Sequence, residues 1–172
     1  ICREYGIPFV LDAAQTAGHY PVDFQAMGLS ALSMPGHKGL MGPSGIGVLL
    51  LSHEFAQKLT PIVTGGTGSA SDSEAQPNYM PDKFESGTPN VPGVYGLHAA
   101  VDFILNTGVD AIQKREHELT KRFLDGLQDV SGIRPAGSWE LENRVGVISI
   151  DFTNIDNAEA AYQLEQDYGI LT

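Results

Sequence analysis

The stretch MPGHKGLMGPSGIGVLLL, residues 34–51, decides the fold of this 172-residue chain. It places His37 and Lys38 in a glycine-rich turn between two short apolar segments, residues 31–34 and 45–51. Short runs of Val, Ile and Leu bounded by Gly and Pro are typical of buried strands in parallel or mixed sheets. The stretch therefore predicts two strands of an α/β layer, joined by a turn that displays a histidine and a lysine.

A second polar motif precedes this turn. The segment PFVLDAA, residues 8–14, predicts a buried strand that ends at Asp12, and Gln15 follows three residues later. Ligands of open α/β sheets bind beside the carboxyl ends of the strands, which makes Asp12 a candidate binding residue. Taken alone, Asp12 could equally cap the start of a helix, and Lys38 could be a solvated surface lysine.

Apolar spacing and capping signals predict the remaining elements. We expect helices at residues 21–27, 53–59, 94–105, 112–130 and 157–168, and strands at residues 8–14, 31–34, 45–51, 133–136 and 144–152. Asp156 and Glu159 form a possible capping box for the last helix, and Thr107-Gly108 marks a break between two others. The order of elements divides near residue 108. Residues 1–108 are expected to be part of a large α/β domain, and residues 109–172 the beginning of a smaller α+β domain.

Residues 64–93 stand apart because they are dense in Gly, Ser, Pro and Asn. A loop of this length inside a compact domain is usually either functional or disordered. The run TGGTGS within it could be a flexible linker, or it could close near a binding site. Tyr79 and Phe84 favour a segment that docks on the rest of the protein.

Composition excludes several classes of function. The formal net charge is −11, so the chain would repel nucleic acids and anionic membranes, and neither is an expected partner. The single cysteine, Cys2, cannot form an internal disulfide. No apolar run approaches the roughly 18 residues that span a bilayer, and no signal peptide is visible. A cytoplasmic protein is the default, and both ends of the chain are expected to lie inside a longer protein.

Four motifs together resemble one known family. DAAQ at 12–15, GHK at 36–38, GPSGIG at 42–47 and FESGTPN at 84–90 occur in the order and spacing of class V aminotransferase-type enzymes, in particular cysteine desulfurases and selenocysteine lyases. The resemblance covers essentially the whole chain. It implies a fold-type-I enzyme that depends on pyridoxal 5′-phosphate (PLP), with residues 1–108 in its PLP-binding large domain.

The resemblance also implies roles for individual residues. Lys38 would form a Schiff base with PLP and then serve as the proton-transfer base. Asp12 would pair with the pyridinium nitrogen of the cofactor, and Gln15 would donate a hydrogen bond to its phenolic oxygen. His37 would contact the phosphate. Thr88 would reach the phosphate of a second subunit's cofactor, which implies a homodimer.

The implied reaction converts L-cysteine to L-alanine and passes the sulfur to an enzyme cysteine, and a sulfur-acceptor protein could follow. We do not expect Cys2 to be that cysteine, because it precedes the first strand and lies far in sequence from every motif. The family's catalytic cysteine and substrate-carboxylate arginine are expected after Thr172. This chain by itself is therefore expected to have little or no desulfurase activity.

The sequence departs from the family pattern at Pro35, where many relatives carry a phosphate-binding serine. Proline has neither a hydroxyl nor a backbone donor, so Ser33 or residues 65–69 would have to compensate. Two other hypotheses stay open. The protein could be a class V aminotransferase or another PLP-dependent lyase of small amino acids, or the chain could be a catalytically inert piece. No metal site is expected.

Overall fold

A computed structural model describes residues 1–70, 72–142 and 144–172 of the chain. These residues form two compact units, Ile1–Asp110 and Ala111–Thr172. The division falls close to the boundary expected from the sequence. The assignment of the two units to a large and a small domain of a longer enzyme stays a prediction.

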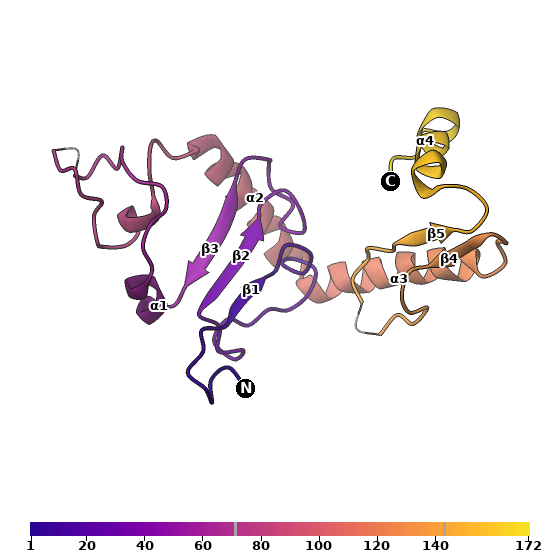
Figure 1. The fold of residues 1–172 in the computed structure, drawn as a ribbon, viewed down its shortest axis with the longest axis horizontal. Helices are drawn as coiled ribbons and strands as arrows, with labels where there is room; N and C mark the ends of the chain where they lie inside the picture. The colour runs from indigo at the N-terminus through magenta and orange to yellow at the C-terminus, as the bar shows by residue number, and fades with distance from the viewer. Residues whose placement is uncertain (71, 143) are drawn as a thin grey trace. The chain divides into compact units, whose positions relative to one another are not determined.

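The first unit is built on a three-stranded sheet with the order β1-β2-β3 (Figure 1). Strands β1 (Val10–Asp12) and β2 (Ala31–Pro35) are parallel, whereas β3 (Gly47–Leu51) pairs with β2 in the antiparallel direction. The mixed sheet and its three strands were predicted from the apolar runs, but the burial expected for β1 and β3 is wrong, because Val10 and Leu49 are each 55% exposed. The strands themselves are shorter than predicted at β1 and β3.

Helix α2 (Val91–Thr107) crosses one face of this sheet (Figure 1). A cavity of about 540 Å³ lies there, lined by Leu32 and Leu50 of the sheet and by Ile104 of the helix. Leu32 and Ile104 are 4% and 5% exposed, so they belong to the core of the unit. The core continues through Ala13, Ala17 and Leu29, which pack with Leu32.

The connections between the strands of the first unit and α2 include the short helix α1 (His53–Lys58), and one of the predicted helices is absent from them. Helix α1 begins at Ser52, whose hydroxyl accepts a hydrogen bond from the amide of Phe55. The helix expected at residues 21–27 does not form, and this part of the chain makes turns. Asp23 caps a single turn, because its carboxylate accepts hydrogen bonds from Gln25 N and Ala26 N, both at 2.9 Å, and the left-handed Gly28 (φ 65°) then ends it.

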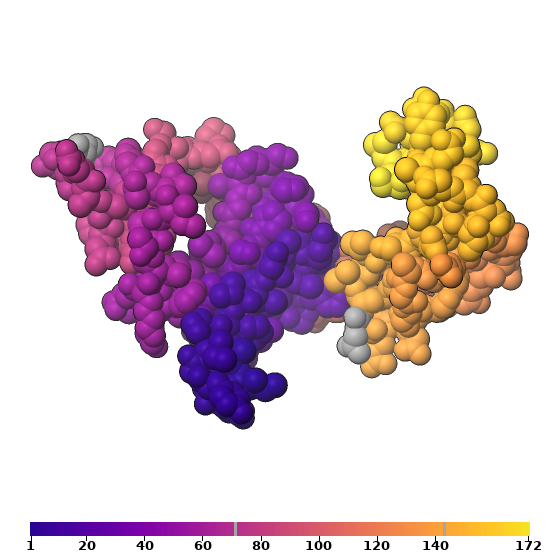
Figure 2. All heavy atoms as spheres, in the orientation of Figure 1, coloured from indigo at the N-terminus to yellow at the C-terminus, as the bar shows by residue number. Residues whose placement is uncertain are grey.

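Hydrogen bonds link described residues of the polar segment between α1 and α2, within residues 59–70 and 72–90. The segment contains a short 3₁₀ helix, η1 (Asp82–Phe84), and hydrogen bonds that join its distant parts. Figure 2 shows this segment, coloured magenta to pink, lying together at one side of the first unit.

The second unit packs a two-stranded sheet with helices. Helix α3 (Val109–Leu127) follows Gly108, whose φ of 88° produces the predicted break after α2. Strands β4 (Ile133–Pro135) and β5 (Ile150–Phe152) are antiparallel, and α4 (Asn157–Tyr168) begins at Asp156 as predicted. The long strand expected at residues 144–152 is wrong, because only its last three residues pair.

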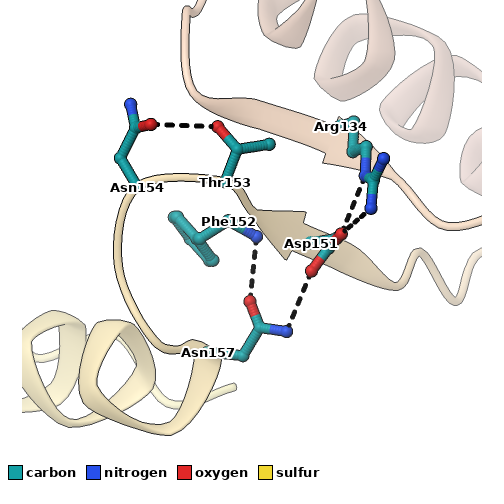
Figure 3. Close-up of polar contacts among 6 residues, drawn as sticks. All are labelled: Arg134, Asp151, Phe152, Thr153, Asn154 and Asn157. Atoms are coloured by element: carbon teal, nitrogen blue, oxygen red, sulfur yellow. Dashed lines mark hydrogen bonds and ion pairs between the residues drawn. The ribbon is translucent and has the colours of Figure 1, made fainter.

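Figure 3 shows what joins β4, β5 and α4. The carboxylate of Asp151 accepts hydrogen bonds from Arg134 Nε and Nη2 at 2.7 and 2.5 Å, and from Asn157 Nδ2 at 3.1 Å. Asn157 Oδ1 in turn accepts a bond from the amide of Phe152 at 2.8 Å. These contacts fix the start of α4 to the end of the hairpin. They also hold the pKa of Asp151 below its ordinary value, with Asn157 as the larger cause and Arg134 as the next.

Candidate active site

Asp12 ends β1 and begins a tight turn. Its Oδ1 accepts a hydrogen bond from Ala14 N at 2.9 Å, and Ala13 O accepts bonds from Thr16 N and Ala17 N. No helix follows, so Asp12 does not cap a helix start but closes a turn with its side chain. A carboxylate has two oxygens and accepts several hydrogen bonds, so this turn is compatible with a ligand role for the exposed Asp12.

Lys38 lies in a loop whose backbone is closed by hydrogen bonds. Gly36 N donates to Ile46 O at 2.8 Å, Gly42 N donates to Gly36 O at 2.7 Å, and Met41 N donates to Lys38 O at 2.8 Å. His37 and Lys38 are exposed, whereas the glycines on either side of them, Gly36 and Gly39, are buried. The loop therefore displays the side chains of His37 and Lys38 on a backbone held by hydrogen bonds.

The two loops are in direct contact through glycine. A β-carbon on Gly39 would lie 2.2 Å from Ala17 O and 2.0 Å from Cδ2 of His19, and a β-carbon on Gly18 would lie 2.1 Å from Gly39 O. Real β-carbons do not approach other atoms this closely, so only glycine fits at both positions. The imidazole of His19 consequently packs on the residue that follows Lys38.

Strand register brings these loops to the same edge of the sheet. Asp12 is the register partner of Ser33 in the parallel pair β1–β2, and Ala13 N donates to Ser33 O at 2.9 Å. Both loops therefore leave the carboxyl ends of their strands. The structure thus brings Asp12, Gln15, His37 and Lys38 to one edge, where the sequence analysis expected a ligand.

Thr88 lies in a different environment. It is exposed and follows Gly87, whose amide donates to Gly65 O at 3.2 Å. Two residues later, Asn90 Nδ2 donates to Gly45 O at 3.1 Å, and Asn90 Oδ1 accepts from Gly93 N at 3.1 Å. The segment of Thr88 thus touches the end of the Lys38 loop through Asn90, while the contact expected of Thr88 with a second subunit's cofactor stays a prediction.

The predicted residues did not include three that shape this site. His19 packs on Gly39, Asn90 caps α2 while holding Gly45, and Lys83 is a buried lysine. The asparagine was detectable in principle, since Asn before Val-Pro-Gly is a typical helix N-cap. No local pattern identifies the other two, because their partners lie 20 or more residues away.

The donor set fits PLP and does not suggest a metal. An exposed amine, a carboxylate, an amide and an imidazole, from Lys38, Asp12, Gln15 and His37, match the groups that a protein supplies to PLP. Pro35 ends β2 and offers no hydrogen-bond donor, so fewer groups are available to bind the phosphate of PLP than to bind its ring. Among residues 1–70, 72–142 and 144–172, no three His, Cys, Asp or Glu side chains are grouped as metal ligands would be.

Comparison with known proteins identifies the family. The sequence model of the family described as aminotransferase class-V matches residues 1–172. The chain belongs to the class V aminotransferase family. Members of this family and its cysteine desulfurases use PLP, and the family assignment made from the four motifs is confirmed.

Within the class V family, similar proteins carry the name cysteine desulfurase. The chain is 38% identical over 167 residues to a probable cysteine desulfurase of Pyrococcus abyssi, covering 95% of this chain and 41% of that protein. The apo structure of a cysteine desulfurase from Thermococcus onnurineus matches with a TM-score of 0.84 and 33% identity, covering 98% of this chain and 42% of that one. The cysteine desulfurase CsdA of Escherichia coli matches with a TM-score of 0.81 and 27% identity, covering 99% and 42%.

These matches confirm the fold class, although they cover only part of each relative. The first unit has the mixed α/β architecture of part of a fold-type-I PLP enzyme, as predicted. The chain spans about two fifths of the length of the relatives it matches. Among the described residues, no helix combines the length and apolarity needed to span a bilayer.

Proposed function

We propose that this chain carries the Schiff-base lysine of a PLP-dependent cysteine desulfurase, and that this lysine is Lys38. One observation carries the proposal. The exposed Lys38 sits on a hydrogen-bonded loop that glycine contacts lock against the Asp12 loop, at the carboxyl edge of the parallel strands. PLP chemistry requires an amine and a carboxylate on the same binding site, and the backbone contacts of the two loops support a shared site for Lys38 and Asp12.

Bound PLP supplies an electron sink for negative charge that develops at the α-carbon of an amino acid. The Asp12 carboxylate would hold a proton on the ring nitrogen, and the Gln15 amide would orient the ring by donating to its phenolic oxygen. The Lys38 amine would hold the group covalently. After substrate has taken its place, the same amine would move a proton at the substrate α-carbon.

The phosphate would be held by His37 from this chain and by Thr88 from a second copy, so the proposed protein is a homodimer. Ser33 and residues 65–69 remain candidates to replace the serine that Pro35 lacks. The proposed substrate is L-cysteine, with a separate protein as the sulfur acceptor and the cytoplasm as the location.

The position of Cys2 supports its exclusion from the chemistry. Cys2 lines a cavity together with Phe9 and Ser30, which directly precede β1 and β2. This cavity therefore lies at the opposite ends of the parallel strands from Asp12 and Lys38. We propose that a different cysteine receives the sulfur.

Borohydride reduction after incubation with PLP tests the assignment of Lys38. The reagent fixes a Schiff base to the lysine that formed it, and peptide mapping then locates the label. We expect the label on Lys38, an absorbance band near the visible edge, and loss of both in Lys38→Ala but not in Lys58→Ala. A label distributed over the other exposed lysines, or an unchanged band in Lys38→Ala, would overturn the proposal.

A further inference from the structure

Lys83 is a buried lysine outside the set of residues proposed to contact PLP. It lies in η1, only 5% exposed, directly before the FESGTPN segment. Its ammonium donates to Ala56 O at 2.9 Å and to Gln57 O at 3.3 Å, and lies 5.4 Å from the centre of the Phe84 ring. The side chain thus connects η1 to the last turn of α1.

This arrangement stabilises a charge that would otherwise be costly to bury. An ammonium removed from water needs hydrogen-bond acceptors, and the last carbonyl groups of a helix are unpaired acceptors with partial negative charge. The aromatic ring of Phe84 adds a cation–π attraction at this distance. Removing the ammonium would therefore leave the two carbonyls and the η1 turn without the contact that joins them.

Further hydrogen bonds hold the same turn from its other side. Gln76 Nε2 donates to Asp82 O at 2.8 Å, while Gln76 Oε1 accepts from Gly65 N at 2.9 Å. Gly65 O then accepts from Gly87 N at 3.2 Å. The start of the FESGTPN segment is consequently tied both to α1 and to the glycine-rich run.

The far end of the segment is fixed by Asn90, through Gly45 and the cap of α2. Between the anchors at Lys83 and Asn90, the residues Glu85 and Thr88 are exposed. A side chain on an arc held at both ends loses less conformational entropy when it binds a ligand than one on a free loop.

We propose that Lys83 is a positioning residue whose buried ammonium holds the FESGTPN segment so that Thr88 is presented to a phosphate group. The proposal rests on the role of Thr88 in the proposed function. Lys83 itself does not touch the phosphate. It acts through the backbone that it fixes to α1, which is a role that the motif alone does not reveal.

The test compares Lys83→Met, which keeps the stem and removes the ammonium, with Lys83→Arg, Thr88→Ala and a control, Lys58→Met. Lys58 lies on the same α1 with its side chain 63% exposed. The first readout is amide hydrogen exchange at residues 84–90. The second is the affinity for PLP compared with that for pyridoxal, which lacks the phosphate.

In Lys83→Met we expect exchange at residues 84–90 to accelerate about 10-fold, a change of about 1.4 kcal/mol, with β2 and α2 unchanged. The PLP affinity should fall as far as in Thr88→Ala, whereas the pyridoxal affinity stays constant. Lys83→Arg should recover most of both effects, and Lys58→Met should match the unmodified chain. Lys83→Gln, which keeps a neutral donor, replaces Lys83→Met if that variant does not fold, and should give intermediate values.

The outcomes separate this inference from the proposed function. If Thr88→Ala weakens PLP binding while Lys83→Met changes neither readout, Lys83 is not a positioning residue and the function of the site stands. If Thr88→Ala does not change the affinity for PLP, Thr88 does not bind the phosphate. The proposed role of Lys83, which depends on Thr88, is then also wrong. An equal loss of pyridoxal and PLP affinity in Lys83→Met would show a general structural role and would also overturn the inference.

Discussion

Gly18 packs so closely on Gly39 that a β-carbon at position 18 would lie 2.1 Å from the carbonyl oxygen of Gly39. Gly18 also has a φ of 85°, a conformation that other residues rarely adopt. Together with the packing of Ala17 and His19 on Gly39, this contact fixes the backbone of the Asp12 loop against that of the Lys38 loop. The geometry of the candidate site therefore depends on two residues that have no side chain.

Gly18→Ala should destabilise the first unit more than a change at another left-handed glycine. Gly6 is the matched control, because its φ is 63° and no atom lies within 4 Å of a β-carbon built there. Left-handed strain alone should cost Gly6→Ala about 1–2 kcal/mol, and overpacking should add about 1–3 kcal/mol in Gly18→Ala. Urea denaturation followed by circular dichroism measures both. If both variants lost the same free energy of unfolding, the close contact between Gly18 and Gly39 would not contribute to stability, and the prediction would be wrong.

His19→Ala should loosen the Lys38 loop, because the imidazole packs on Gly39. We expect a loss of about 1 kcal/mol in unfolding free energy, typical for a partly buried contact. The yield of borohydride-fixed PLP on Lys38 should fall with it. His98→Ala is the control, since the exposed His98 pairs with Asp102 at 3.6 Å on the surface of α2. An unchanged labelling yield in His19→Ala would show that Lys38 does not depend on this packing.

Asn90 has two separable functions, as cap of α2 and as donor to Gly45. Asn90→Ala removes both contacts and should lower the free energy of unfolding of the first unit by about 1–2 kcal/mol. Asn90→Asp keeps the capping oxygen but places a carboxylate against Gly45 O, so we expect an intermediate loss. The fluorescence of Trp139, the single tryptophan, reports the second unit and should not move. Asp156→Ala removes the cap of α4, so this variant should change the unfolding transition that Trp139 reports and leave the stability of the first unit unchanged.

The second unit should lose stability in acid through Asp151. Bonds from Asn157 and Arg134 lower the pKa of Asp151 in the folded protein below the value of about 3.9 expected for an unfolded chain. Stability from this carboxylate is therefore complete above the unfolded pKa and is lost as the pH falls through the lower folded pKa. Asp151→Asn should be less stable at pH 7 and should show a weaker decline between about pH 5 and pH 2. Denaturation monitored by Trp139 fluorescence across this range provides the comparison, and parallel pH curves for both proteins would contradict the prediction.

Much of the fold was predictable because its elements carry local signals. The apolar runs around the Lys38 turn identified the strands, and Asp156 and Gly108 marked helix boundaries correctly. The error at residues 21–27 arose because Asp23 begins a capped turn just as it would begin a helix. Gly28, at the end of this turn, adopts a left-handed conformation that a helix cannot continue through. The apolar alternation at residues 144–152 likewise predicts a strand but does not guarantee a pairing partner.

The residues of the candidate site were proposed from motifs, and their roles stay predictions; the contacts that hold the loops carrying them could not be predicted from the sequence. Motif order indicated Asp12, Gln15, His37 and Lys38, and strand register explains why they share an edge. The contacts that hold this edge join residues far apart in the chain. Lys83 and Ala56, for example, are separated by 27 positions and meet only because α1 and η1 pack together. Such contacts follow from tertiary packing, on which local patterns carry no information.

Because Lys38 is exposed and Lys83 is buried, comparing their rates of chemical labelling can show how often the region around η1 opens. Amine-reactive reagents can modify Lys38 at any time, but they reach Lys83 only when η1 detaches from α1. The ratio of the two labelling rates therefore measures how often that region opens under native conditions. Followed against PLP concentration, the labelling rate of Lys83 relative to that of the exposed Lys58, which is not proposed to hold PLP, would report whether a ligand at the Lys38 edge slows the opening of η1.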